Sequence, residues 1–195
     1  MTDLLVPSRA RRLKARTHEA HERLDARIMS GRPFEDRERY ARFLIVQHAF
    51  HRDIDTLYSD PRLVALLPGL PERRRLKAIE QDLGDLGVEI SGNEAPPVFT
   101  AAGIDIPVAL GWLYVAEGSN LGAALLRKEA AKLGLSDDFG ARHLAGHPEG
   151  RAAHWRAFVA ALDAAVLNAE EEEGMTVGAE AAFARVHALA DAAFA

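Results

Sequence analysis

Apolar residues recur at intervals of three and four along most of the chain, the spacing that places them on one face of an α-helix. No stretch combines sustained period-two alternation with β-branched residues, so the pattern does not predict strands. We therefore expect an all-α protein with about seven or eight helices of ordinary length. No internal repeat or linker divides the chain, and residues 1–195 are predicted to form a single domain.

Capping and breaking residues set the predicted helix boundaries. Ser8 can cap a first helix that ends near Met29, before a Gly-Arg-Pro break. Pro107 suits the first turn of a long helix that stops near Gly134. We interpret the acidic run at 170–173 as the solvated end of a helix. The other predicted helices cover residues 36–58, part of 60–69, 70–84, 151–173 and 176–194.

The composition excludes several classes of protein. A formal net charge of -5 gives no overall basic surface for nucleic acid. The absence of cysteine excludes disulfides, thiolate metal sites and thiol nucleophiles. The N-terminal apolar run is too short for a signal peptide, and no run approaches the ~20 residues of a membrane span. We therefore expect a cytoplasmic protein without a membrane anchor.

The predicted helix at 107–134 contains Gly111, Gly118 and Gly122. A glycine inside a helix is less favourable than alanine by up to ~1 kcal/mol, so the glycines need a reason. Gly118 and Gly122 stand four residues apart and share one face. Another body can lie flat against that face, either a neighbouring helix or a planar ligand.

The first predicted helix carries a candidate metal ligand. Asp25 follows His21 by one turn, so its carboxylate can hold an imidazole N–H, as the partners of metal-bound histidines do. Lys14 precedes His21 by two turns, roughly 10 Å along the axis. This face offers an axial ligand, its orienting carboxylate and a cation for a porphyrin propionate. It equally fits a solvated helix face with a histidine–aspartate pair.

A second group of cations and aromatic residues comprises Arg151, Trp155, Arg156 and Phe158. Arginines beside aromatic rings suit an anionic, partly apolar ligand. They also suit a helix that packs its arginine stems against the core, so the group alone does not decide between the two.

Other histidine-based metal sites are not predicted. A ferritin-like di-iron bundle needs Glu-x-x-His motifs, and none of the eight histidines has a glutamate three residues before it. The His18/His21 and His48/His51 pairs have a spacing that can bind zinc, but no nearby Glu-x-x-His or cysteine completes a site.

Two separated motifs resemble the haem oxygenases. KARTHEAHERLD at 14–25 resembles the first helix of that family, and LYVAEGSNLG at 113–122 resembles the distal helix of its bacterial branch. Both motifs in this order are a specific signal, and the likeness extends from about residue 10 to 165. Shorter matches are YARF at 40–43, LPGL at 67–70, DFGARHL at 138–144 and WRAF at 155–158.

On the proximal side, the resemblance implies that His21 is the ligand of the haem iron and that Asp25 is its hydrogen-bond partner. Lys14 and Arg156 take the positions of two propionate-binding residues. These two cations favour the orientation of haem that gives biliverdin IXα.

On the distal side, the resemblance implies that Gly118 and Gly122 lie directly over the haem, where the helix kinks. Tyr114 matches an aromatic position near the haem. Ser119 stands where some members of the family carry an acidic residue, so ordered water is expected to deliver protons.

The reaction implied is oxidative cleavage of haem to biliverdin, carbon monoxide and ferrous iron, with haem as both cofactor and substrate and dioxygen as co-substrate. The electrons must come from outside, from a ferredoxin or an NAD(P)H-dependent reductase, because the chain has no Rossmann fingerprint or flavin motif. A basic group at Arg11, Arg12, Lys14 and Arg16 suits an acidic ferredoxin. We expect a monomer.

Three other functions fit the helical pattern. A haem-binding or trafficking protein of the same fold would hold haem without cleaving it. A thiamin-degrading enzyme of the same architecture would be expected to use a cysteine, which the chain lacks. A helical interaction module would bind no haem at all.

Overall fold

The structure, a computed structural model, describes residues 8–90 and 95–195 and contains only helices and loops within those ranges. The α-helices are α1 (Arg9–Ser30), α2 (Arg37–Ile54), α3 (Pro61–Leu66), α4 (Leu76–Asp85), α5 (Ile106–Lys132), α6 (Arg151–Ala164) and α7 (Ala169–Ala193). Three 3-10 turns are η1 (Asp55–Ser59), η2 (Pro71–Arg73) and η3 (Arg142–Leu144). The predicted all-α class is confirmed.

Local signals account for the starts of the two motif-bearing helices. The side chain of Ser8 accepts a hydrogen bond from the backbone N–H of Arg11 and caps α1, as predicted. The side chain of Asp105 accepts from the N–H of Val108, and Pro107 lies in the first turn of α5.

The predicted helix at 151–173 is wrong, because α6 ends at Ala164 and α7 begins at Ala169. Asn168 forms a capping box: its side chain accepts from the N–H of Glu171, whose carboxylate accepts from the N–H of Asn168. The acidic run at 170–173 is therefore the first turn of α7, where the helix dipole favours carboxylates. It is not the end of α6.

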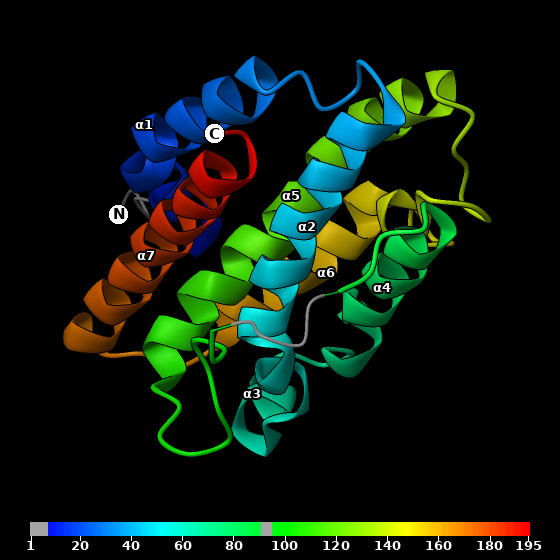
Figure 1. Ribbon diagram of the computed structural model, residues 1–195. Coiled ribbons are helices and arrows are strands. Elements are labelled where there is room, and N and C mark those ends of the chain that lie inside the picture. The colour runs from blue at the N-terminus through cyan, green and yellow to red at the C-terminus, as the bar shows by residue number, and fades with distance from the viewer. Residues whose placement is uncertain (1–7, 91–94) are drawn as a thin grey trace.

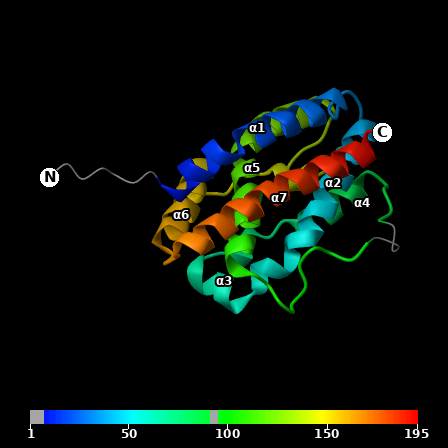
Figure 2. The same cartoon turned by 90° about the vertical axis from the view of Figure 1, so that its left-hand side faces the viewer.

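The helices pack around α5 and α7. Figure 1 shows α1 and α7 along one edge of the molecule, α2 and α5 in the middle and α4 towards the opposite edge. Figure 2 shows α1 and α7 running alongside each other, and α7 packs against both α1 and α5. Helix α7 therefore bridges the two helices that carry the family motifs.

Gly111 belongs to the contact between α5 and α7. A Cβ atom at Gly111 would lie 2.1 Å from the carbonyl oxygen of Met175, and one at Gly178 would lie 2.2 Å from that of Val108. Only residues without a side chain allow the two backbones to come this close. The helix-packing explanation of the glycines on α5 thus applies to Gly111.

The buried apolar residues form two clusters, and the division falls within α5. The part of α5 from Ala109 to Ala116 belongs to the larger cluster, whereas Ala123 and Ala130 belong to the smaller one. Glu117 lies buried at the division. None of the helices in the described ranges combines the length and hydropathy that a membrane span requires.

Candidate active site

His21 presents an exposed imidazole on α1. Its side chain is 59% exposed, and Nδ1 lies 3.4 Å from Oδ2 of Asp25, one turn further along the helix. The ring meets the ring of Phe183 on α7 edge to face, with centroids 5.8 Å apart. Within the described part of the chain Nε2 has no partner, and the carboxylate of Asp25 lies on the Nδ1 side of the ring.

An apolar stripe on α5 is exposed. We define the glycine stripe as Gly118, Leu121, Gly122 and Leu125, which lie at helical spacing on one face. Leu121 is 42% exposed and Leu125 64% exposed, although α5 is fully buried from Ala109 to Glu117. Two exposed leucines on one face of a helix whose preceding turns are in the core make this face a candidate binding surface.

The two motif glycines differ from Gly111 in their surroundings. A Cβ atom at Gly122 would meet no atom within 4 Å, and one at Gly118 would meet only the ring of Trp155, at 3.7 Å. No helix backbone of the described chain therefore packs against this pair as α7 packs against Gly111, and the planar-ligand explanation is favoured. The helical assignment continues unbroken across both glycines, so the kink stays a prediction.

The other residues with predicted roles lie around these two features. Lys14 is exposed and borders an open hollow beside α1, and Arg156 is exposed on α6. Tyr114 is buried one turn before Gly118, and its hydroxyl donates to the carbonyl oxygen of Ala10 at 3.4 Å. Tyr114 thus links α5 to α1 one turn before Lys14.

The hydroxyl of Ser119 is engaged within α5. It donates to the carbonyl oxygen of Ala116 at 2.7 Å, although the residue itself is exposed. This hydrogen bond uses the only proton of the hydroxyl, which leaves the oxygen as an acceptor.

The predicted basic group on α1 is partly neutralised. Arg12 pairs with Glu172 at 2.9 Å and Arg16 with Glu173 at 3.3 Å, both on α7. Arg11 and Lys14 have no ion-pair partner among residues 8–90 and 95–195.

A buried ion pair anchors α5 directly before the glycine stripe. Arg73 donates from Nη1 to Oε2 of Glu117 at 2.8 Å, and the two side chains are 5% and 2% exposed. Burial raises the pKa of Glu117 and the Arg73 charge opposes that rise. Arg73 also donates to the carbonyl oxygen of His154 on α6, so it holds α5 against α6.

Sequence reasoning missed several of these features. Leu121 and Leu125 follow Gly118 by three and seven residues, and their helical spacing was a usable signal. Phe183 and Arg73 are far from the motifs in the sequence, and no local pattern marks either one as a neighbour of the site.

Comparisons with known proteins identify the family of this chain. The model of the haem oxygenase family matches residues 8–192. The chain is 44% identical over 187 residues to heme oxygenase PigA of Pseudomonas aeruginosa, covering 96% of this chain and 93% of that protein. It is 31% identical over 161 residues to a heme oxygenase of Xanthomonas campestris pv. campestris, covering 80% and 92%.

Solved structures of haem oxygenases also match the fold of this chain. The NO- and CO-bound heme oxygenase from Neisseria meningitidis matches with a TM-score of 0.90 and 43% identity, covering 97% of this chain and 93% of that one. The heme oxygenase of Leptospira interrogans shares the fold, with a TM-score of 0.77 at 18% identity over 95% and 100% of the chains. The chain therefore belongs to the haem oxygenase family, whose members are haem-degrading enzymes.

Proposed function

We propose that this protein binds haem between α1 and the glycine stripe and cleaves it to biliverdin, carbon monoxide and ferrous iron. The observation that carries the proposal is the combination of an exposed, oriented imidazole on α1 with an uncovered apolar stripe on α5. Bound haem supplies both the iron that activates dioxygen and the macrocycle that is opened.

His21 is proposed as the axial ligand. Oδ2 of Asp25 lies 3.4 Å from Nδ1 of His21, and we propose that in the haem complex it accepts the Nδ1 proton, which fixes the tautomer with Nε2 unprotonated and makes that nitrogen a better donor to iron. A neutral imidazole, unlike a thiolate, does not push electron density towards O–O cleavage. The edge of Phe183 limits rotation of the ring.

The glycine stripe is proposed as the opposite wall. Gly118 and Gly122 let a flat ligand approach the backbone, and Leu121 and Leu125 bury apolar surface against it. Because glycine has no side chain, a dioxygen molecule between the ligand and this part of α5 would meet only backbone atoms of the two glycines. Ser119 retains acceptor capacity for an ordered water.

Lys14 and Arg156 are proposed as the partners of the two propionates, which fix the rotation of the macrocycle and favour biliverdin IXα. Both side chains are exposed, so each can reach a ligand without losing an existing ion pair in the described chain. If they set the orientation, Lys14→Ala will raise the share of other isomers, whereas Arg16→Ala, which changes a cation paired with Glu173, will not.

The electron donor is proposed to be a ferredoxin or an NAD(P)H-dependent reductase. Arg11 and Lys14 provide unpaired positive charge beside the ligand face of α1, which suits an acidic donor. We further propose that the protein acts as a cytoplasmic monomer, without nucleic acid or membrane as a partner.

Turnover of the haem complex tests the proposal. The purified protein is loaded with haemin and supplied with ascorbate or a ferredoxin–reductase pair, and the products are separated by chromatography. Loss of the Soret band with formation of biliverdin IXα is expected. A stable complex whose Soret band persists would indicate a haem-binding or trafficking protein, and the absence of any haem spectrum would refute both.

A further inference from the structure

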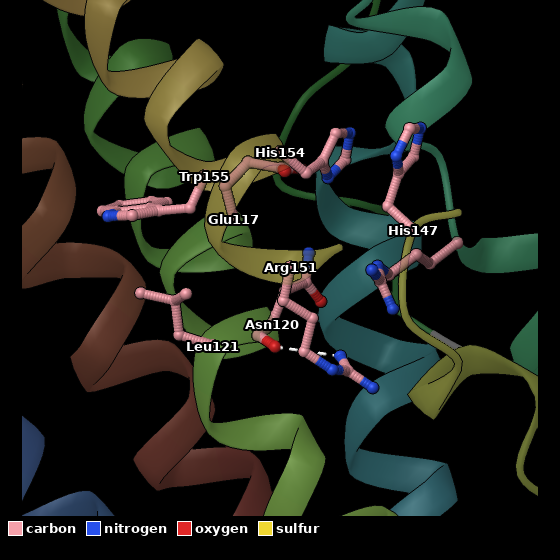
Figure 3. A pocket seen from close by; sticks show the side chains of 8 residues that line it. Glu117, Asn120, Leu121, His147, Arg151, His154 and Trp155 are labelled. Atoms are coloured by element: carbon pink, nitrogen blue, oxygen red, sulfur yellow. Dashed lines mark hydrogen bonds between the residues drawn. The ribbon is translucent and has the colours of Figure 1, made fainter. Parts of the chain in front are cut away.

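A small cavity lies between α5, α6 and the loop that precedes α6. Its volume is about 10 Å³, the space of roughly one water molecule. Figure 3 shows Arg151 of α6 next to Asn120 of α5, with His147 on the other side of Arg151. The polar residues that line it are Arg75, Glu117, Asn120, His147, Arg151 and His154.

Two arginines of this cavity lack a carboxylate partner. Arg75 donates from Nη1 to the carbonyl oxygen of His143, and its buried Nε has no partner in the described chain. Arg151 donates to the carbonyl oxygens of Asn120 and Leu144, and Figure 3 marks the first of these bonds. Carbonyl oxygens satisfy N–H groups, but they do not neutralise a guanidinium charge.

The nearest carboxylates are already engaged. Glu117 accepts from Arg73 at 2.8 Å. The charge of Asp137 reaches Arg151 only at longer range. Both carboxylate oxygens of Asp137 already accept hydrogen bonds from Arg127, at 2.6 Å. The cavity therefore retains the charge of two guanidinium groups. Burial lowers the pKa of both Arg75 and Arg151, and the charges of Glu117 and Asp137, both already paired with other arginines, oppose that shift only in part.

The rest of the lining suits a weakly hydrated ligand. The rings of His147 and His154 are stacked, with centroids 4.2 Å apart and planes 5° from parallel. Leu121 and Trp155 supply an apolar boundary. A cavity of about 10 Å³ with N–H donors and an apolar boundary suits a small ion better than an oxyanion of several atoms.

We propose that this cavity is a binding site for a single halide ion, held between Arg75 and Arg151. The ion neutralises charge that the protein leaves unpaired, and it lies beside Asn120, two residues after Gly118. The proposal does not depend on haem cleavage, because it concerns charges present in the protein without haem.

Halide dependence of stability and bromide diffraction test the site together. Sodium chloride or bromide should raise the Tm of the full-length protein by about 2–4 °C, in a saturable manner, relative to sodium gluconate at equal ionic strength. Crystals soaked in bromide should show an anomalous peak between Arg75 and Arg151. Phosphate should not compete with bromide for that position.

Matched variants separate the site from general salt effects. Arg151→Gln keeps a donor for the Asn120 carbonyl but removes one charge, and it should abolish the halide-specific rise in Tm. Arg42→Gln changes an exposed arginine paired with Glu38 on α2, and it should retain the rise. Equal stabilisation by gluconate and halide would overturn the proposal. So would an anomalous difference map of the bromide-soaked, unmodified protein with no peak in the cavity. Neither result depends on whether the enzyme cleaves haem.

Discussion

Nδ1 of His21 lies 3.4 Å from Oδ2 of Asp25, and the two residues stand one turn apart on an exposed face of α1. In the proposed haem complex this carboxylate holds the Nδ1 proton and leaves Nε2 for the metal. This role predicts that Asp25→Asn will still bind haemin but with affinity or turnover lowered by about 10- to 100-fold, because the carboxylate that orients the ring is lost. Haemin titration and initial rates measure both quantities. Glu22→Gln is the matched control, since Glu22 contacts the neighbouring His18 across the same i,i+4 spacing, through Nε2, and an equal loss there would contradict the specific role of Asp25.

The glycines of α5 should respond to substitution with opposite signs. Gly122→Leu should stabilise the haem-free protein by up to ~1 kcal/mol, because a side chain there meets open space and favours the helix. The same change should weaken haemin binding, because the leucine occupies the ligand face. Gly111→Ala should destabilise the protein by about 1–3 kcal/mol, since its Cβ atom would collide with the backbone of α7. Urea unfolding and haemin titration of both variants test this contrast. Unimpaired haemin binding by Gly122→Leu would contradict the proposed wall.

The buried Arg73–Glu117 pair should be sensitive to the loss of either partner. Arg73→Met removes the ion-pair partner of the buried Glu117 carboxylate next to the glycine stripe and leaves only the longer-range charge of Arg75, and we expect a loss of about 3–5 kcal/mol in the free energy of unfolding. Replacing both residues by apolar ones of similar size should recover much of that loss, because no charge is then left unpaired. Chemical denaturation of the two single variants and the double variant checks this. Additive losses would argue against a coupled pair.

Buried histidine should make the protein sensitive to acid. Burial, together with the charge of Arg75, lowers the pKa of His51 to about 3. In the unfolded chain this ring takes up a proton near its ordinary pKa of about 6.5, so the unfolded state binds more protons and stability falls as pH decreases. The free energy of unfolding should begin to fall near pH 6.5, the ordinary pKa of histidine, and should continue to fall towards pH 3. Urea unfolding between pH 7 and pH 5 should show a shallower slope for His51→Phe than for the unmodified protein, and an unchanged slope would exclude His51 as a source.

The two motif-bearing helices could be predicted from sequence because their signals are local. The cap at Ser8, the Pro107 start and the glycine spacing each act within one or two turns. The boundary between α6 and α7 was mispredicted because alanine-rich sequence around Asn168 continues the helical spacing on both sides. The capping box of Asn168 and Glu171, although visible in the sequence, decides the break.

The surroundings of the site could not be predicted to the same degree. His21 and Asp25 are neighbours in sequence, whereas Phe183, Arg73 and Arg75 reach the site only through the packing of α7, η2 and α4. Long-range contacts of this kind depend on how the helices cross, which periodicity does not specify.

A crystal structure of the protein grown with haemin tests the central claim most directly. We expect the iron to be bonded to Nε2 of His21, with the other face of the macrocycle in van der Waals contact with Gly118 and Gly122. A macrocycle bound elsewhere, a His21 ring turned away from the iron, or a glycine stripe covered by protein would contradict the proposed site.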